Sequence, residues 1–545
     1  MTPTKILLVF PLFNPNSFWS FGAACEAAGA RCPAPPLGLI TLAALLPQTW
    51  EFRLINRNAE PLDEGDILWA DLVMTGGMLP QQVDTLAIVR RCKDLGKPVC
   101  VGGPDPTSSP HLYDAADFLV LGEAEGVIDA FVAAWMRGER KGIFQAEKFQ
   151  ADLSKSPVPR FDLLDFKHYL FVGIQFSRGC PFNCEFCDII ELYGRVPRTK
   201  TNEQMVAELD RLYTLGYRGH VDFVDDNLIG NKKALKRFLS VLKAWQQKNR
   251  YPFKFSTEAS INLADHPELL TMMSEANFFA IFVGIESSDS DTLISIQKKQ
   301  NARRSLEESV FKIYAAGMYV LAGFIVGFDT ETKAVAAEMV DCIEATSIPI
   351  CMVGLLTALP NTQMTRRLER EGRLFPGYDA VLPERGDQCT AGLNFVPARP
   401  RRNILQDYKE VLERIYAPAA FFRRLTTVGQ VLRRPALRVR PSRAVVAKDL
   451  ATLVRVAWRM TIHKPALAHR FWRLLLSCAC TNPRALEYVV TMIVIFLHVG
   501  PFAAHVIADL ETQIAAIDRG ERSETMRVGQ DQATNRAAVG CKSMG

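Results

Sequence analysis

The first 140 residues alternate short apolar runs with helix-like segments. The runs lie at 5–10 (KILLVF), 52–56, 72–77, 98–103 and 118–123, and Gly, Pro or Asn lies within the last two residues of each run or directly after it. Apolar strands of this kind, separated by helices, are typical of a parallel sheet with right-handed crossovers. We therefore expect an α/β protein whose residues 1–140 form a doubly wound, Rossmann-like domain.

A second alternation begins at residue 171. Its six apolar runs lie at 172–177, 219–227, 253–260, 280–287, 319–329 and 349–360. Six βα units over about 200 residues predict a partial (β/α)6 barrel of the TIM type, with its chemistry at the carboxyl ends of the strands. The predicted division is a domain at 1–140, a proline-marked linker at 141–170, the barrel at 171–372, a mainly helical region at 373–520 and a flexible tail at 521–545.

The helical region has the strongest local charge bias in the chain. Residues 397–475 contain 18 Lys and Arg against 4 Asp and Glu, with Phe421, Phe422, Trp458 and Trp472 between them. A helical lid with a solvated basic face would show this pattern, and so would a surface that rests on an anionic membrane. Both interpretations remain open. The net charge of the whole chain is only +5 and no RNA-binding module is recognisable, so nucleic acid is the least favoured partner.

One apolar stretch near the C-terminus invites comparison with a membrane span. Residues 488–510 are apolar for about 17 positions, whereas a span needs roughly 20, and His498, Gly500 and Pro501 interrupt the run. We do not expect it to cross a membrane. The N-terminus lacks the pattern of an export signal, so we expect a cytoplasmic protein, peripheral on the inner face of the membrane if the basic segment docks there.

Three of the thirteen cysteines are clustered. Cys180, Cys184 and Cys187 follow the first barrel strand with the spacing C-x3-C-x2-C. A structural zinc site needs a fourth ligand, which Cys342 or a histidine would have to supply. The simpler interpretation is a [4Fe–4S] cluster with three thiolate ligands and one iron left open for a chelating substrate. Gly179 and Pro181 would let the loop turn tightly, and Phe186 would shield the cluster.

The motif C-x3-C-x-aromatic-C at the first strand of a six-unit barrel resembles the radical S-adenosylmethionine (SAM) superfamily. The resemblance implies that SAM binds at the open iron and is held at the strand ends. The residues that match the superfamily's SAM contacts are Asp225, Asp226, Glu258, Gly284, Glu286, Gly323 and Gly327, with Asp329 following the last of them. For any one of these acids alone, a surface salt bridge or a helix cap is the alternative.

The carboxyl ends of the first-domain strands are rich in small residues. The candidates for ligand contact there are Asn58, Thr75, Gly76, Gly102, Gly103, Gly122 and Glu123. Ligands of open parallel sheets bind at this edge, and glycine allows close approach, although tight turns would require glycine too.

Together with "VGGPDPTS", "LGEAE", "FSRGCPFNCEFCD" and "FVDDNLIGN", these strand ends make residues 1–375 similar to cobalamin-binding radical SAM proteins, in the bacterial branch that includes hopanoid methylases. No D-x-H-x-x-G motif is present, and His111 is the one histidine in residues 1–140. The resemblance therefore implies a base-off cobalamin without a histidine ligand.

The resemblance also implies an activity. The cluster would cleave SAM to a 5′-deoxyadenosyl radical, and methylcobalamin would give its methyl group to an unactivated carbon of a small-molecule or lipid substrate. A flavodoxin or ferredoxin would supply electrons. A cobalamin-binding radical SAM cyclase or oxidoreductase remains an alternative. A cobalamin or iron–sulfur sensor is disfavoured, because the cysteines and the acidic strand ends are all intact.

Overall fold

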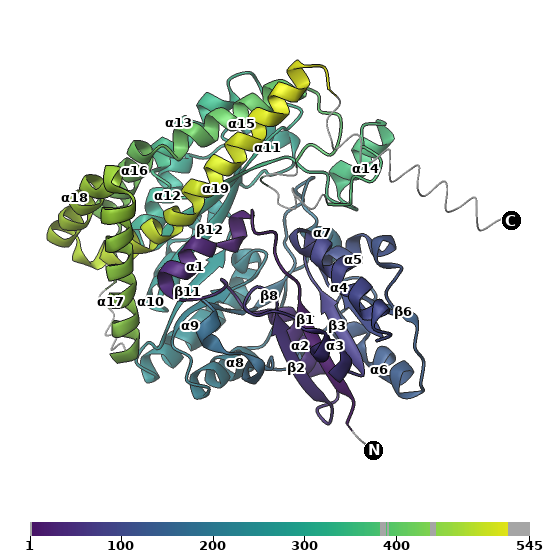
Figure 1. Cartoon of the computed structure of the whole chain (residues 1–545). Coiled ribbons are helices and arrows are strands. Elements are labelled where there is room, and N and C mark those ends of the chain that lie inside the picture. Colours follow the sequence, from purple (N-terminus) through teal and green to yellow (C-terminus); the bar gives the residue numbers. More distant parts are fainter. Residues whose placement is uncertain (1–2, 382–388, 390–391, 436–442, 522–545) are drawn as a thin grey trace.

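The computed structural model describes residues 3–381, 389, 392–435 and 443–521. Two parallel sheets and a helical C-terminal region pack into one body (Figure 1). This confirms the predicted fold class. The predicted tail at 521–545 lies, apart from Glu521, outside the described residues.

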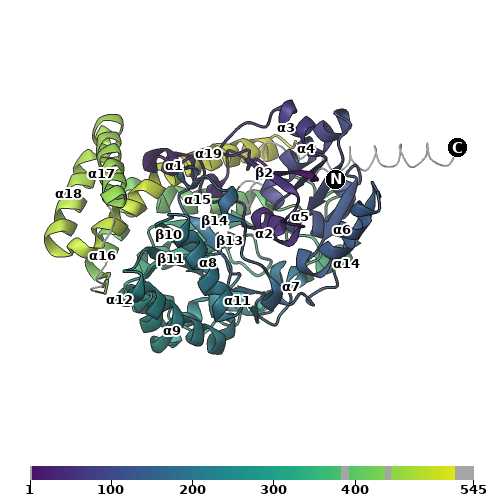
Figure 2. The ribbon, with the colours of Figure 1, turned by 90° about the horizontal axis from the view of Figure 1, so that it is seen from below.

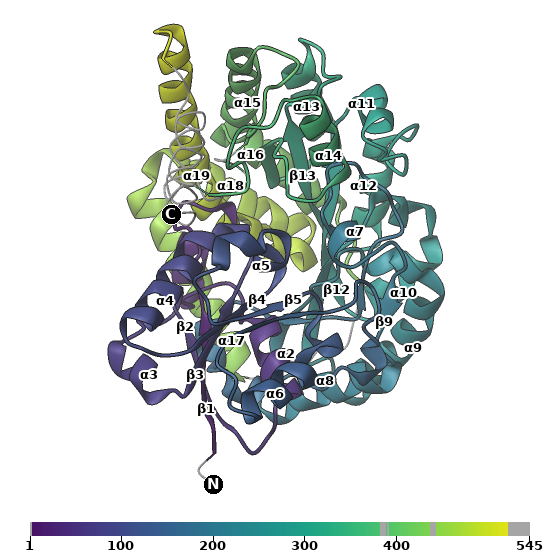
Figure 3. The same ribbon diagram turned by 90° about the vertical axis from the view of Figure 1, so that its right-hand side faces the viewer.

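The first sheet has the strand order β2-β1-β3-β4-β5-β6, and all its strands are parallel. Helices α3 (Glu64–Trp69) and α4 (Gln82–Asp94) cover one face, and α2 (Leu37–Leu45) and α6 (Ile128–Met136) cover the other (Figure 3). The strands are β1 (Lys5–Phe10), β2 (Glu51–Asn56), β3 (Leu72–Gly76), β4 (Val99–Gly102), β5 (Phe118–Leu121) and β6 (Gly142–Gln145). Strand β6 was not predicted. Its residues fall in the range expected to be linker.

The second sheet has the order β14-β13-β12-β11-β10-β7, again all parallel, and it curves inside a layer of helices (Figure 2). The six predicted strands are all present. They are β7 (Val172–Ile174), β10 (Gly219–Phe223), β11 (Phe253–Glu258), β12 (Phe278–Glu286), β13 (Tyr319–Val326) and β14 (Cys351–Leu355). The outer helices are α8 (Asn202–Thr214), α9 (Lys232–Lys248), α10 (Pro267–Glu275), α11 (Ser290–Ser295), α12 (Leu306–Ala315) and α13 (Val335–Thr346).

Alternation along the barrel strands separates an apolar outer layer from a polar interior. In β10 the Phe223 ring packs on Phe238 of α9, so that side of the strand faces the helices. Asp222 therefore points to the other side, where Ser256 of β11 donates a hydrogen bond to it. The period of two thus gives the barrel a polar interior within a hydrophobic shell.

The C-terminal region is helical, as predicted. It contains α15 (Arg401–Ile415), α16 (Pro418–Val431), α17 (Arg443–Trp458), a π turn (Arg459–His463), α18 (Pro465–Thr481) and α19 (Leu486–Asp518). Within the described residues, the segment 483–518, which contains α19, is the one helical stretch long and apolar enough to cross a membrane, yet 56% of its most apolar window is buried in the protein.

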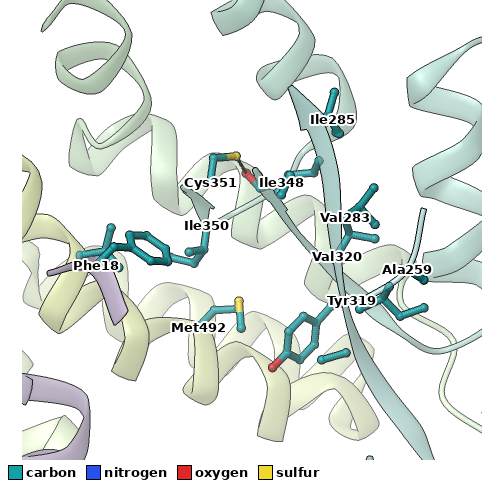
Figure 4. Packing of buried hydrophobic residues seen from close by; sticks show 14 of the residues in the cluster. Phe18, Ala259, Val283, Ile285, Tyr319, Val320, Ile348, Ile350, Cys351 and Met492 are labelled. Atoms are coloured by element: carbon teal, nitrogen blue, oxygen red, sulfur yellow. Dashed lines mark hydrogen bonds between the residues drawn. The ribbon is translucent and has the colours of Figure 1, made fainter. Parts of the chain in front are cut away.

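The first turns of α19 close the amino ends of the barrel strands. Glu487 accepts a hydrogen bond from Lys254 of β11 at 2.6 Å, and Tyr488 stacks on Phe279 of β12 with ring centroids 6.0 Å apart. Met492 lies in the same hydrophobic core as Tyr319 and Ile350 (Figure 4). The long apolar helix α19 thus serves as the floor of the barrel.

Replacing Met492 by alanine tests this role. The side chain is fully buried, so Met492→Ala should destabilise the protein by about 2–5 kcal/mol through lost burial and the cavity left behind. Urea unfolding followed by tryptophan fluorescence would show a lower midpoint. His505→Ala, at an exposed position of the same helix, should change stability by less than about 0.5 kcal/mol. Equal midpoints for Met492→Ala and the wild type would contradict the packing.

Candidate active site

The three clustered cysteines lie on one loop framed by a hairpin. Strands β8 (Ser177–Arg178) and β9 (Arg198–Thr199) pair antiparallel at its two ends. The Cys180 N–H donates to the Gly194 carbonyl at 3.2 Å, and the Cys187 N–H donates to the Cys184 carbonyl. Gly179 has φ +95°, and a Cβ there would lie 2.9 Å from the Gly194 oxygen. Only glycine fits this turn, as the sequence indicated.

Two amide side chains point at the thiols. Asn227 Nδ2 approaches Cys180 Sγ, and Gln300 Nε2 approaches Cys184 Sγ, each at 3.7 Å. Amide N–H groups suit thiolate sulfur, so the donor set and its surroundings fit a thiolate-bound iron–sulfur cluster. Cys342, considered as a fourth zinc ligand, lies instead in the outer helix α13.

Two predicted acids hold the framework of this loop. Asp225 is buried and accepts hydrogen bonds from the backbone N–H groups of Phe176 and Ser177. Asp226 accepts the Gly179 N–H at 2.9 Å, directly before Cys180. Burial raises the pKa of Asp225 to about 7 and that of Asp226 to about 6. Both carboxyls therefore fix the cysteine loop to the end of β10, and their role as SAM contacts stays a prediction.

Glu258 is the predicted acid that remains open to a ligand. Its side chain is accessible to solvent at the end of β11, although protein surrounds it closely. This desolvation, together with repulsion from Asp222 and Asp226, raises its pKa to about 8. Glu286 and Asp225 add to the repulsion. An interior with this many carboxyls favours a cationic ligand, and SAM carries both a sulfonium and an ammonium group.

Glu286 is engaged by a lysine that the sequence analysis did not identify. Lys298 Nζ lies 2.5 Å from Glu286 Oε1, and both residues are buried. A Cβ on Gly284 would fall 2.4 Å from that oxygen, so glycine makes room for the ion pair. Lys298 also lies 5.8 Å from the Phe186 ring centroid, and Cys184 and Cys187 contribute to raising its pKa, after Glu286. The pair therefore borders the cysteine loop.

Gly323 lies in β13, and Gly327 directly follows that strand. A Cβ on Gly323 would lie 3.3 Å from the Phe282 ring, closer than an ordinary van der Waals contact, so the ring would have to shift. Gly327 has φ +119°, and its N–H donates to Glu331. Asp329 is held by Arg367 and Arg373. Contacts within the protein therefore account for Gly327 and Asp329, and the roles of these two residues as SAM contacts stay predictions.

At the carboxyl edge of the first sheet, several predicted ligand residues have structural partners. A Cβ on Gly76 would lie 1.9 Å from the Gly102 oxygen, while Gly103 and Gly122 have φ +100° and +83°. Thr75 donates to the Val9 carbonyl, and Asn58 bridges Pro11 and Phe13. Backbone groups, rather than these side chains, are left for a ligand. His111 forms an ion pair with Asp379 at 3.0 Å.

A cavity of about 520 Å³, including its open mouth, lies between this edge and the cysteine loop. It unites the predicted Gly122 and Glu123 with residues that the sequence did not indicate. These are Thr107, Ser108, Gln145, Ala146, Glu147, Lys148, Phe149, Asp188, Glu191, Leu192, Pro360 and Asn361. Its walls come from the first sheet, the helix α7 (Ile189–Leu192) after the cysteines, and the loop after β14. A ligand bound at this position would contact both domains.

Glu123 connects the two domains. It accepts a hydrogen bond from Arg198 at 2.8 Å and one from Arg178 at 3.2 Å. Glu125 receives two further bonds from Arg178. Burial by itself would raise the pKa of Glu125, but the hydrogen bonds and charge of Arg178 outweigh it and lower the pKa to about 2. Glu123 therefore positions the cysteine loop, and its contact with a ligand stays a prediction.

Sequence comparisons identify the family. The radical SAM superfamily pattern matches residues 174–343, and a domain of unknown function (DUF4070) matches residues 362–512. The chain is 42% identical over 490 residues to the uncharacterized methyltransferase sll1242 of Synechocystis, covering 90% of each protein. It is 35% identical to the hopanoid C-2 methylase of Rhodopseudomonas palustris, over 85% of this chain and 87% of that one. The chain belongs to this family of B12-binding radical SAM methyltransferases.

Solved structures agree with the fold. The cobalamin-dependent radical SAM enzyme OxsB, with aqua-cobalamin bound, has a TM-score of 0.57 at 14% identity and covers 97% of this chain and 84% of its own. The radical SAM methyltransferase TsrM from Kitasatospora setae has a TM-score of 0.55 at 13% identity, over 83% of this chain and 99% of its own. At this identity the likeness concerns the arrangement of the domains.

The Gln300 contact predicts an effect on the cluster. Removing an N–H donor to a thiolate sulfur destabilises the reduced, more negative cluster, so Gln300→Leu should lower its reduction potential. A hydrogen bond of about 1 kcal/mol corresponds to about 40 mV for one electron. An EPR-monitored redox titration without SAM would measure the shift. Lys299→Arg, which keeps the charge of an exposed neighbouring residue, is the matched control and should leave the potential unchanged. Equal reduction potentials for Gln300→Leu and the wild type would show that the hydrogen bond from Gln300 does not stabilise the reduced cluster.

Glu258 predicts a pH-dependent stability. The unfolded chain loses this proton near pH 4.5 and the folded chain near pH 8, so the stability of the apoprotein should fall as pH rises between these values. Glu258→Gln cannot ionise and should gain Tm over the wild type, with a larger gain at pH 8.5 than at pH 5. Glu51→Gln, an exposed position on β2, controls for the loss of one carboxylate. A Tm difference that does not change with pH would refute the assignment.

Proposed function

We propose that this protein is a cobalamin-dependent methyltransferase that transfers a methyl group to an unactivated carbon of a lipid substrate of the hopanoid type. The observation that carries the proposal is the similarity to a hopanoid C-2 methylase along nearly the whole chain, including the C-terminal region outside the barrel. The cavity between the first sheet and the cysteine loop supports the cobalamin part, because it lies between the two cofactor-binding domains.

The residues around the barrel mouth would have different roles in binding the cluster and SAM. Cys180, Cys184 and Cys187 would hold the cluster, and Asp226 fixes the start of their loop through Gly179. Glu258, at the end of β11, would receive the cationic part of SAM. When bound, the cluster and SAM supply the radical that removes a hydrogen atom from the substrate, and cobalamin supplies the methyl group.

The first sheet would hold cobalamin through backbone contacts at Gly102, Gly103 and Gly122 and through the cavity beyond β5 and β6. His111 is instead paired with Asp379, which supports a base-off cobalamin without a histidine ligand. A small, strongly reducing protein such as a flavodoxin or ferredoxin would supply electrons. We place the enzyme in the cytoplasm, in contact with the inner face of the membrane where a lipid substrate lies.

Anaerobic reconstitution with iron, sulfide and hydroxocobalamin tests the proposal. The chain should bind about four irons and one cobalamin and should cleave SAM to 5′-deoxyadenosine when reduced. Cys184→Ala should lose this cleavage, whereas Cys342→Ala, on the outer helix α13, should retain it. Incubation with hopanoid lipids should give products heavier by one methylene unit.

The outcomes separate the parts of the proposal. Ser108→Phe, which fills the cavity, should lower cobalamin content while leaving the four irons in place. SAM cleavage by a reconstituted protein that binds no cobalamin would refute the proposed methyl transfer. A product of changed structure but without added carbon would indicate a cyclase or an oxidoreductase. Bound zinc without a cluster would refute the radical chemistry.

A further inference from the structure

Exposed apolar side chains gather on the helices α17 and α18. Seven of the seventeen exposed large apolar residues in the described chain lie between positions 446 and 476. Five follow one another at intervals of four along α17 and the π turn, where such a spacing produces a continuous ridge. We call the set the apolar ridge: Val446, Leu450, Val454, Trp458, Ile462, Trp472 and Leu476, which are 43–62% exposed.

The two helices present the ridge as one surface. The indole N–H of Trp472 in α18 donates to the hydroxyl of Thr461 in the π turn at 3.1 Å, so Trp472 lies against the turn that also carries Ile462. Beneath the ridge, Val456, Met460 and Phe471 are fully buried in the hydrophobic core. The exposed apolar residues are therefore the outer side of ordered helices. Figures 1 and 2 both place α17 and α18 at the end of the molecule away from α6.

The charge around the ridge is positive. Residues 443–485 contain eight Lys and Arg and one acid, Asp449. Lys464 and Arg473 are exposed, Arg470 is half-buried, and none of the three forms an ion pair within the described part of the chain. Two other arginines contact the α1 segment (Gly22–Ala28 and the residue after it): Arg459 pairs with Glu26 at 2.6 Å, and Arg455 lies against Gly29.

We propose that the apolar ridge docks on the surface of an anionic lipid bilayer. Tryptophan and leucine side chains would enter the headgroup region, while Lys464, Arg470 and Arg473 contact lipid phosphates. A second copy of this chain fits the surface poorly, because a two-fold contact would bring the same cations opposite one another with one acid available to offset them. The proposal concerns where the protein binds and is independent of the reaction proposed above.

The docking surface is connected to the barrel interior. Arg455 of α17 and Arg459 of the π turn contact the α1 segment at Gly29 and Glu26. The turn before α1 carries Trp19, whose ring centroid lies 5.7 Å from that of Phe282 in β12. Phe282 lies on the same side of its strand as Gly284 and Glu286, the side that faces the polar interior. The α1 segment with the turn before it, and then strand β12, thus connect a bilayer at the ridge to the polar interior of the barrel, where the chemistry is expected.

Co-sedimentation of the full chain with vesicles tests the proposal. At low salt the protein should bind vesicles of phosphatidylcholine and phosphatidylglycerol in a 4:1 ratio and should bind pure phosphatidylcholine much more weakly. The double variant Leu450→Glu/Trp458→Glu should reduce binding to the anionic vesicles about tenfold or more. The matched control Leu68→Glu/Met136→Glu places the same charges at equally exposed positions of the first domain and should bind as the wild type.

Three results would overturn the proposal. Wild-type protein that stays in the supernatant with both vesicle types would do so, as would a correctly folded Leu450→Glu/Trp458→Glu variant that binds like the wild type. A dimer in light scattering that Leu450→Glu/Trp458→Glu dissociates would show that a second copy covers the ridge. Circular dichroism of both double variants establishes that they are folded. Loss of methyl transfer alone would bear on the proposed reaction and leave the docking result unchanged.

Discussion

The buried ion pairs of Arg178 set the spacing on which the rest of the site depends. Arg178 immediately precedes Gly179 and Cys180, and its guanidinium lies between Glu123 and Glu125 at the end of the first sheet. A guanidinium bonded to two carboxylates has little freedom to rotate, and leaving any of the three buried without its partner would cost about 3–5 kcal/mol. The end of β5 and the first cysteine therefore move as one unit.

This rigid connection explains why the cavity lies where it does. Its walls include Glu123 on one side and α7, which follows the cysteines, on the other. A ligand in it contacts both domains at once, so its reactive face would be held at a fixed distance from the barrel mouth. Enzymes gain rate from such fixed geometry, because the two reacting groups need not find each other during each turnover.

The barrel interior depends on a second constraint, the balance of its charges. Asp225 and Asp226 use backbone N–H groups as partners, and Glu286 uses Lys298. Desolvation, and then repulsion from the neighbouring acids, raises the pKa of Glu258, and no cation in the described chain is paired with it. A cationic ligand would remove the repulsion, so the protein stores electrostatic free energy that SAM binding would release.

The sequence predicted the elements that have strong periodic patterns and missed those defined by tertiary contacts. The strands β1 and β5, with long apolar runs, were predicted. Strand β6 was taken as linker because it is an edge strand with only two apolar residues, Ile143 and Phe144. Strands β8 and β9 have two residues each, too few for a period. Since β6 was missed, so were the cavity residues that follow it.

The site residues divide in the same way. The three cysteines carry their chemistry in their spacing, and the structure places them on one loop as expected. Lys298 and Gln300 lie in a polar turn after α11 without a motif, and only the folded chain brings them beside Glu286 and Cys184. Conversely, the sequence could not show that Thr75, Glu123 and Glu286 would be occupied by partners within the protein.

The C-terminal region shows how burial changes the meaning of an apolar pattern. The run 488–510 continues through Pro501 as the single helix α19, although an interior proline costs about 3 kcal/mol. The helix persists because its side chains are buried against the amino ends of the barrel strands, α1 and α15. The less apolar α17 keeps its ridge exposed, since its opposite side already packs on α1. Hydrophobicity alone would point to α19 as the membrane-seeking segment. Packing buries much of α19 within the protein and leaves the apolar ridge of the more basic α17 exposed, so α17 is the helix available to a bilayer.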